Sequence, residues 1–331
     1  MNNHFKAITL KATGAKEFVK IGTIQSLWSG YGEIVRYGLE GSDFKSVVIK
    51  HISLPSQAQH PRGWNTDLSH QRKIKSYHVE MAWYQQWSHL CSAVCRVPRC
   101  LAVESQQDEM FILLEDLDSA GFPVRLTQVS VSEIKTCLSW LANFHAIFMH
   151  RQPDHLWEVG TYWHLETRPD ELQTLQDELL KKSAVALDQK LRDSPFQTFV
   201  HGDAKLANFC FSKDGKSVAA VDFQYVGGGC GMKDVVYFIG SCLDEKQCQQ
   251  LETTLLDYYF DVLKKAITVN HKMIDPNEVE QDWRPLYSFA WTDFHRFIKG
   301  WSPEHWKINS YSEQIARKVV LQLTENIGEN S

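Results

Sequence analysis

The sequence predicts an α+β protein made of two lobes. With 331 residues the chain is longer than a single hydrophobic core usually supports, which favours two lobes over one. Short apolar and β-branched runs gather in roughly the first 115 residues, whereas helical periodicity dominates after about residue 130. We therefore expect a mixed protein of strands and helices that is divided into two lobes.

Composition and charge narrow the class of protein. Hydrophobic residues make up 43% of the chain and aromatic residues 12%, which is enough for a sizeable core. The formal net charge of -5 gives no basic surplus of the kind that nucleic-acid-binding proteins carry. We see neither an eighteen-residue apolar run nor a signal-peptide pattern. The expectation is a cytoplasmic protein with no nucleic-acid, membrane or obligate protein partner.

Eight cysteines are scattered along the chain without a Cys-x-x-Cys pair, which predicts reduced and mostly buried thiols. The three cysteines that cluster are Cys91, Cys95 and Cys100, and His89 could join them around a zinc ion. Their spacing matches none of the usual zinc patterns, so buried thiols are favoured.

The first lobe begins with a predicted strand, turn and strand from Ile24 to Tyr37, with Gly30 and Gly32 at the turn. Glycines allow backbone N–H groups to approach a bound phosphate closely, although an ordinary hairpin turn explains two glycines equally well. The next strand, Ser46 to Lys50, is β-branched and ends in a lysine. Taken alone, this lysine could belong to any solvated strand end.

A predicted helix from about Ser69 to His89 carries a carboxylate on its apolar face. Glu80 shares that face with Tyr77 and Tyr84 at helical spacing. A carboxylate on a buried face requires a partner of opposite charge or a hydrogen-bond donor. The alternative is a solvated Glu80 at the edge of the apolar stripe.

A second strand pair is predicted at residues 96–103 and 110–114, directly before Glu115-Asp116-Leu117. The second lobe then opens with a capping box, Ser130-Val131-Ser132-Glu133, which predicts a helix that continues to Phe148. His145 lies on that helix, and we expect it to be packed and hydrogen-bonded. A polar helical stretch is predicted from Asp170 to Arg192.

The most informative segment runs from Phe199 to Gln224. Asp214-Gly215 between two apolar runs predicts a hairpin, with Asn208 just before its first strand and Asp222 just after its second. Cross-strand neighbours lie roughly 5 Å apart, so the two oxygens could share a Mg²⁺ ion. Asp203, on the loop before the hairpin, would orient a nucleophile. The alternative treats these residues as turn formers and a strand cap.

The order of these residues resembles the catalytic layout of the kinase fold. In detail it resembles the aminoglycoside phosphotransferase and choline kinase group, and especially its ecdysteroid-kinase-like branch. The matching motifs are His201-Gly202-Asp203, Asp222-Phe223-Gln224, the Glu-x-x-x-Tyr pattern from Glu80 to Tyr84, and Leu114-Glu115-Asp116-Leu117.

This resemblance implies a protein-kinase-like bilobal fold, with a small antiparallel sheet plus one helix in a nucleotide-binding lobe at residues 1–117. Residues 118–331 would form a mainly helical catalytic and acceptor-binding lobe. The implied reaction moves the γ-phosphoryl group of ATP, with Mg²⁺, to a hydroxyl of a small-molecule alcohol.

The resemblance also implies a role for each candidate residue. Asp203 and Lys205 would be catalytic, and Asn208 and Asp222 would be the metal ligands. Lys50, paired with Glu80, would bind the phosphates together with the backbone near Gly30 and Gly32. The backbone carbonyl of Glu115 and the N–H of Leu117 would bind adenine. Lys205 departs from the histidine common in aminoglycoside-type loops and would neutralise charge on the transferring phosphoryl group. Asp234 is expected to be a structural anchor and helix cap, and His201 a brace for the loop.

Two alternatives stay open. A protein kinase is disfavoured because Gly202 replaces the usual arginine, Gln224 replaces a glycine, and no long activation segment fits before Asp234. A non-catalytic nucleotide-binding module is disfavoured because Lys50 and the acidic motifs are all present. The acceptor is not named by the sequence. The aromatic stretch from Trp283 to Trp301, with Asp293, would either line the acceptor pocket or form helical core.

Overall fold

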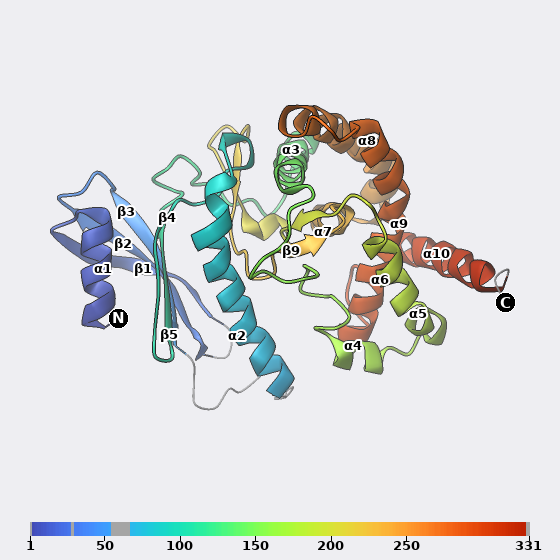
Figure 1. The fold of residues 1–331 in the computed structure, drawn as a ribbon, viewed down its shortest axis with the longest axis horizontal. Helices are drawn as coiled ribbons and strands as arrows, with labels where there is room; N and C mark the ends of the chain where they lie inside the picture. Colours follow the sequence, from blue (N-terminus) through green and yellow to red (C-terminus); the bar gives the residue numbers. More distant parts are fainter. Residues whose placement is uncertain (1, 28–29, 54–66, 329–331) are drawn as a thin grey trace. The chain divides into compact units, whose positions relative to one another are not determined.

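The computed structural model describes residues 2–27, 30–53 and 67–328, apart from the side chains of residues 67 and 326–328 (Figure 1). Trp28 and Ser29, inside the predicted glycine turn, lie outside the described residues. The chain divides into two compact units. Unit 1 comprises Met1–Ser92, Arg96–Arg125 and Cys210–Gln224, and unit 2 comprises Ala93–Cys95, Leu126–Phe209 and Tyr225–Ser331. The α+β class is confirmed.

Unit 1 is built on a five-stranded antiparallel sheet with the order β1-β2-β3-β5-β4. The strands are β1 (Glu17–Ser26), β2 (Gly32–Glu40), β3 (Ser46–Ser53), β4 (Cys100–Gln106) and β5 (Glu109–Glu115). β3 lies between β2 and β5, so its backbone groups are paired on both sides. This central position fixes the residues of β3, Lys50 among them.

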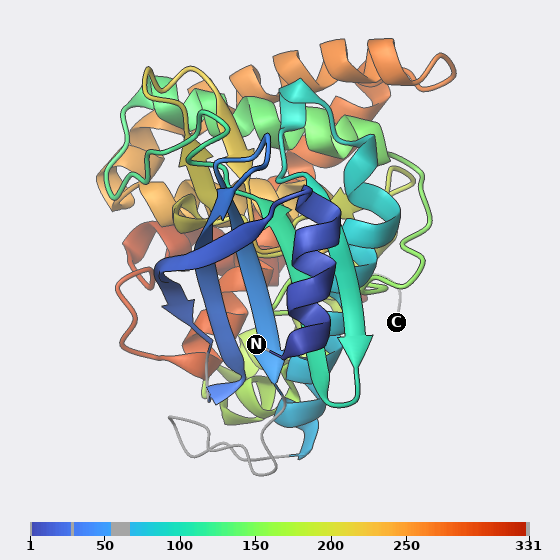
Figure 2. The same cartoon turned by 90° about the vertical axis from the view of Figure 1, so that its left-hand side faces the viewer.

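Helices cover both faces of this sheet. α1 (Asn3–Thr13) packs on one face, where its Phe5 meets Val47 and Ile49 of β3 and stacks on Phe111 (Figure 2). α2 (Asp67–Ala82) lies on the other face. Side chains alternate along a strand, so Lys50 points away from α1 and toward α2. Residues 1–22 carry little sequence signal, so α1 was not predicted.

Two predicted boundaries in unit 1 are wrong. The predicted strand at 96–103 begins only at Cys100, because Pro98 offers no N–H to a ladder and Arg96 forms an isolated bridge with Ala219 instead. The predicted helix from Ser69 to His89 ends as an α-helix at Ala82. It continues as a π-helical turn, η2 (Trp83–Trp87), and a 3₁₀ turn, η3 (Ser88–Leu90).

Unit 2 is mainly helical. Its helices are α3 (Val131–Phe148), α4 (Pro169–Thr174), α5 (Glu178–Lys182), α6 (Ala184–Arg192), α7 (Met232–Cys242), α8 (Glu245–Asn270), α9 (Pro276–Trp301) and α10 (Ser310–Gly328). α3 packs against α8, and α9 packs against α6, α7 and α10. The predicted capping box is confirmed, with Ser130 and Glu133 bonding each other's backbone at the start of α3.

The predicted helical stretch from Asp170 to Arg192 is three short helices, α4 to α6. The chain becomes extended at Leu175, and the Asp177 carboxylate caps a new helix by accepting from Leu180 N–H. A capping aspartate of this kind favours a fresh start over a continuous helix. The stretch is nonetheless helical for most of its length, as the sequence predicted.

The aromatic stretch of α9 is mostly buried. Phe294 and Phe297 join Trp163 and Tyr237 in a cluster that forms much of the core of unit 2. Asp293 is also buried and pairs with Arg296 on the same helix at 2.9 Å. These side chains contribute to the helical core, which was one of the two expectations for this stretch, and Trp291 and Phe294 also line a pocket.

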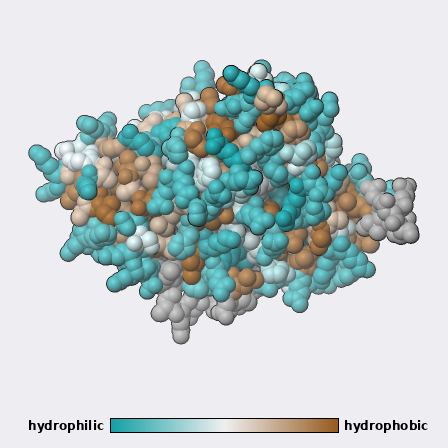
Figure 3. Space-filling view, viewed as in Figure 1, coloured by the Kyte–Doolittle hydropathy of each residue, from teal (hydrophilic) through white to brown (hydrophobic). Residues whose placement is uncertain are grey.

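The surface mixes hydrophilic and hydrophobic residues on the face that Figure 3 shows. Within the described residues, no helix has both the length and the apolar character needed to cross a membrane. All eight cysteines carry free thiols, and Cys95 and Cys230 are among the buried ones. The described residues hold no group of three or more His, Cys, Asp or Glu side chains that could bind a metal, so a zinc site at Cys91, Cys95 and Cys100 has no support.

Candidate active site

A buried lysine on β3 forms the centre of the unit 1 site. Lys50 Nζ lies 2.5 Å from Glu80 Oε2 of α2 and 3.6 Å from Asp222 Oδ1. Both Lys50 and Glu80 are almost fully buried. Burial by itself lowers the pKa of Lys50, but the charges of Glu80 and Asp222 outweigh it and the pKa is raised. The predicted ion pair between Lys50 and Glu80 is therefore present, and the lysine is held as a cation.

The Asp222-Phe223-Gln224 motif is fixed on α2. Phe223 stacks on Trp83 with ring centroids 4.5 Å apart. The Gln224 side chain accepts from Lys73 Nζ at 2.9 Å and donates to Asp222 Oδ1 at 2.7 Å. Asp222 itself has φ +69°, a left-handed conformation that Asp tolerates better than most residues. The local backbone thus turns the Asp222 carboxylate toward Lys50 while its side chain keeps about a third of its exposure (35%).

The glycine turn between β1 and β2 is tied to α2 as well. The Tyr31 hydroxyl lies 2.5 Å from His70 Nδ1. Gly32 has φ +131°, and a Cβ there would stand 2.0 Å from the carbonyl oxygen of His51. Gly32 therefore allows β2 and β3 to pair closely, whereas Gly30, at φ +74°, has open space around it. A role at phosphate stays a prediction for both glycines.

The segment after β5 is held by Asp116. Its carboxylate accepts from Arg36 at 3.0 Å and from Ser46 Oγ at 2.6 Å. The Glu115 side chain accepts from the backbone N–H of Arg99, and its own N–H donates to the Arg99 carbonyl at 3.0 Å. Leu117 is buried, and its carbonyl accepts from Phe122 N–H. The segment is thus rigidly held, while the adenine contacts of Glu115 and Leu117 stay predictions.

In unit 2 the loop with His201-Gly202-Asp203 leaves a short strand, β6 (Thr198–Val200), which pairs with β9 (Gly227–Gly229). Gly202 has φ +79°, and a Cβ there would stand 2.0 Å from the carbonyl oxygen of Tyr225. Only glycine fits this close approach without strain. The same requirement explains why an arginine cannot stand at this position.

Asp234 anchors the loop from α7. Its carboxylate accepts from the backbone N–H groups of His201 at 2.5 Å and Gly202 at 3.0 Å, and it lies 3.2 Å from His145 Nε2. The expected anchoring role is confirmed. The expected helix cap is wrong, because α7 begins at Met232 after Gly231 without a side-chain cap. The Asp234 carboxylate accepts hydrogen bonds from the backbone of the loop instead.

The two histidines act as braces, as predicted. His145 is fully buried and lies 2.7 Å from the Tyr259 hydroxyl, and Asp203 N–H donates to His201 Nδ1 at 3.3 Å. Both rings therefore hold backbone and neighbouring side chains in place. Both histidine side chains are buried within unit 2.

Asp203 stands in a ring of polar groups. Lys205 Nζ donates to Asp203 Oδ2 at 2.8 Å, and the Asn208 side-chain amide donates to the Asp203 carbonyl at 2.7 Å and to Oδ2 at 3.0 Å. Asp203 is 7% exposed, whereas the Lys205 side chain keeps 40%. Since the Asn208 NH₂ group serves Asp203, its amide oxygen is the atom left for another ligand.

Asn208 and Asp222 stand at the two ends of the predicted hairpin, which is confirmed. Asn208 directly precedes β7 (Phe209–Phe211), and Asp222 follows β8 (Val218–Ala220) after one residue. An amide oxygen and a partly exposed carboxylate are hard oxygen donors, which suit Mg²⁺. Each side chain thus offers the kind of oxygen that the predicted ion prefers, and the sharing of one ion by the two stays a prediction.

Sequence reasoning missed two tyrosines beside Asp203. Burial first, and then the charge of Asp203, raise the pKa of both Tyr162 and Tyr237, and a hydrogen bond joins Tyr237 to Asp203. Tyr237 lies one turn of α7 after Asp234. That spacing was the available signal, because residues three apart on a helix share a face.

A comparison with family patterns now identifies the class of protein. The pattern of the ecdysteroid kinase-like family matches residues 67–160 and 158–271, which is more than half of the chain. The chain belongs to the ecdysteroid kinase-like family. The matched spans include Glu80, the Asp203 loop and Asp222, whereas Lys50 and the whole of α9 lie outside them. A search of curated proteins found no significant match.

Solved structures with a similar fold are small-molecule kinases. Amicoumacin kinase hAmiN, in complex with AMP-PNP, Ca²⁺ and Ami, superposes with a TM-score of 0.55 at 12% identity, over 98% of this chain and 96% of that one. Choline kinase from Cryptosporidium parvum Iowa II superposes with a TM-score of 0.54 at 9% identity, over 99% and 97%. These likenesses establish the kinase-like fold for this member of the ecdysteroid kinase-like family.

Proposed function

We propose that this protein is a kinase of small molecules, which transfers the γ-phosphoryl group of ATP to an alcohol hydroxyl. The observation that carries the proposal is Lys50, buried as a cation between Glu80 and Asp222. A buried lysine with two carboxylates is costly to build for stability alone. It is the arrangement that holds nucleotide phosphates and their metal ion in kinases.

The residues that would bind ATP have separate roles. Lys50 would contact the α- and β-phosphates while Glu80 holds it in place. The backbone near Gly30 and Gly32 would cover the phosphates, and the Glu115 carbonyl and Leu117 N–H would bind adenine. We keep residues 1–117 as the nucleotide-binding lobe and 118–331 as the catalytic and acceptor lobe in this proposal.

The acceptor-side residues would position the hydroxyl. Asp203 would accept a hydrogen bond from the incoming hydroxyl and take its proton as the new O–P bond forms. Lys205, now paired with Asp203, would neutralise charge on the transferring phosphoryl group. Asn208 and Asp222 would hold Mg²⁺ through their oxygens, and the ion supplies charge neutralisation on the phosphates when bound.

We also propose a cellular location and a class of partner for this enzyme. We expect the enzyme to work in the cytoplasm on a free small-molecule alcohol, without nucleic acid, membrane or an obligate protein partner. The acidic formal charge of -5 supports the absence of nucleic acid.

A phosphate-transfer screen tests this function. ATP labelled at the γ-phosphate is offered with Mg²⁺ and a panel of amino alcohols, aminoglycosides, sterols and sugars, and the label is followed by chromatography. We expect label on at least one alcohol and none when Mg²⁺ is chelated. Tight binding of Mg·ATP with no transfer to any alcohol would instead support a non-catalytic nucleotide-binding module. Transfer to serine peptides alone would support a protein kinase.

A further inference from the structure

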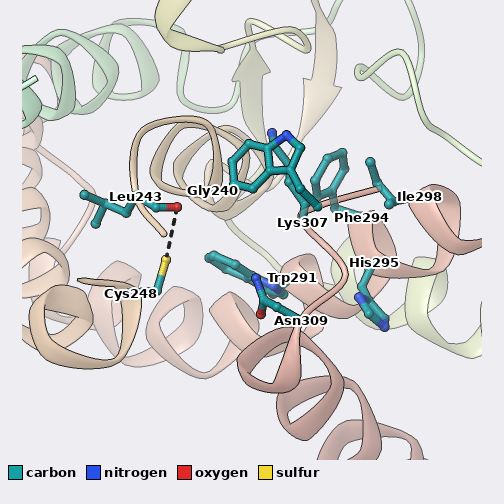
Figure 4. A pocket seen from close by; sticks show the side chains of 10 residues that line it. Gly240, Leu243, Cys248, Trp291, Phe294, His295, Ile298, Lys307 and Asn309 are labelled. Carbon is teal, nitrogen blue, oxygen red and sulfur yellow. Dashed lines mark hydrogen bonds between the residues drawn. The ribbon is translucent and has the colours of Figure 1, made fainter. Parts of the chain in front are cut away.

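The segment between α9 and α10 places a lysine among three aromatic rings. Lys307 Nζ lies 4.9 Å from the ring centroid of Tyr237, 5.3 Å from Phe294 and 5.6 Å from Trp306. We call these three rings the aromatic cage. Figure 4 shows Lys307 beside Phe294 at the wall of a pocket that Trp291 and Asn309 also line. The lysine therefore occupies the cage as a cation–π ligand.

This lysine has no protein partner for its charge in the described part of the chain. Neither a hydrogen bond nor an ion pair of Lys307 Nζ is formed among those residues, and burial lowers its pKa to about 8. The ammonium is nonetheless the main form at neutral pH. Its N–H donors are left for water or a ligand, and Trp306, 60% exposed, leaves the cage open on one side.

The cage adjoins the proposed acceptor end of the site. The Tyr237 ring lies under Lys307, and the Tyr237 hydroxyl is hydrogen-bonded to Asp203. The charges of both Asp203 and Lys205 act on Lys307. One tyrosine thus joins the residue that would receive the acceptor hydroxyl to the cage that holds Lys307.

Aromatic cages of this kind bind quaternary ammonium groups of ligands. Here the cage already holds a cation of the protein itself. A cationic acceptor would have to displace the Lys307 ammonium or sit beside it, and like charges at close range repel strongly in a partly dry site. An uncharged or anionic group meets no such repulsion and can accept from the ammonium.

We propose that Lys307 sets the charge of the acceptor: the enzyme takes alcohols that are uncharged or anionic near the reacting hydroxyl, and it rejects cationic amino alcohols. This inference rests on the proposed function for the identity of the site. It assigns a specificity-determining role to a residue outside the spans that match the family pattern, residues 67–160 and 158–271.

The test uses a matched pair of alcohols. Choline and its carbon isostere neohexyl alcohol have the same shape, but a carbon replaces the quaternary nitrogen in the second. Binding of each is measured by calorimetry to the full-length protein with Mg·ATP analogue present. We expect the wild type to prefer neohexyl alcohol by at least about tenfold, and Lys307→Met to reverse the preference, because the vacated cage accepts choline.

Two further variants serve as controls. Lys307→Arg keeps a cation in the cage and should keep the rejection of choline. Lys318→Met removes an exposed lysine of α10 and should behave as wild type. Near-ultraviolet circular dichroism checks that each variant keeps the native packing of its aromatic rings.

The outcomes separate this inference from the proposed function. Equal binding of the two alcohols by the wild type, or an unchanged preference in folded Lys307→Met, overturns the role of Lys307. Choline binding gained only by Lys307→Met supports it even if no alcohol is phosphorylated, because binding is read without turnover. Absence of Mg·ATP binding and of transfer in the wild type would count against the kinase function alone.

Discussion

Two lysines of this protein, one buried and one half-buried, have opposite surroundings. Lys50 in unit 1 lies between the carboxylates of Glu80 and Asp222, and its pKa is raised. Lys307 in unit 2 lies among aromatic rings, with no carboxylate in contact among the residues that the structure describes, and burial lowers its pKa to about 8. Lys50 is therefore held as a cation at every ordinary pH, whereas Lys307 is a cation at neutral pH that loses its charge as the pH rises through about 8.

The difference indicates what each lysine is for. A fully paired lysine contributes a fixed charge, which suits a phosphate site where the ligand always has the same charge. An unpaired and partly desolvated lysine responds to whatever group comes close, which suits selection among ligands. The following experiments test this contrast, from the largest expected effect to the smallest.

Lys50→Met should separate the two lysines most strongly. Loss of the phosphate-side cation is expected to lower kcat/KM by about 10²–10³-fold, as removal of one preorganised charge typically does. Lys307→Met should leave kcat/KM for an uncharged alcohol within a few-fold. Steady-state kinetics on the best alcohol of the transfer screen measure both. Similar losses in the two variants would break the contrast.

Glu80→Gln tests the pairing of Lys50 by stability. Removing one partner of a buried ion pair leaves an uncompensated charge and is expected to cost about 3 kcal/mol in the free energy of unfolding. The double variant Lys50→Met with Glu80→Gln should cost less than the sum of Lys50→Met alone and Glu80→Gln alone, because no charge of this pair is then left without its partner. Urea unfolding measures all of them. Strict additivity would show that the two side chains are not coupled.

Asp222→Asn tests the metal assignment. With the carboxylate removed, we expect Mg·ATP to bind at least about tenfold more weakly, while metal-free ATP binds almost as before. Titrating the nucleotide with and without Mg²⁺ measures the difference. If the affinity for Mg·ATP is unchanged, the metal is held elsewhere.

The pH dependence of choline binding tests Lys307 in the wild type. Below a pH of about 8 the ammonium predominates and rejects choline, and above it the neutral amine does not, so choline binding should strengthen as pH rises through about 8. The facing groups are Asp203, Lys205, Tyr237, Cys242, Cys248 and His295. Burial raises the pKa of both thiols to about 12 and lowers that of His295 to about 4, so neither kind titrates in this range.

We expect neohexyl alcohol to show no such change, and this alcohol is the internal control for the pH series. A choline profile that is flat between pH 7 and about 9.5 would contradict the role of Lys307. A parallel rise for both alcohols would point to a general effect of pH on the site.

The sequence predicted those parts of the site that depend on short-range order. The hairpin between Asn208 and Asp222 follows from Asp214-Gly215, because local spacing determines its geometry. The pair of Lys50 and Glu80 joins two separate elements, and it was expected from the resemblance to kinases.

Other features depend on contacts between distant parts of the chain. Lys307 reaches Tyr237 only because α7 and α9 pack together and the segment after α9 returns over them. Lys307 stands in no motif that local spacing could reveal, and the spacing of Tyr237 from Asp234 does not indicate its contact with Lys307. The breaks between α4, α5 and α6 and the role of Asp234 as a loop anchor are likewise tertiary, since the partners of that carboxylate lie on another segment.

The central claim is that Asp203 receives the proton of an alcohol during phosphoryl transfer. A single-turnover experiment with wild type and Asp203→Asn, using labelled ATP and the best alcohol of the screen, tests it most directly. We predict that Asp203→Asn binds Mg·ATP within a few-fold of wild type and transfers label about 10²–10⁴-fold more slowly. Transfer at the wild-type rate by the folded variant would contradict the account.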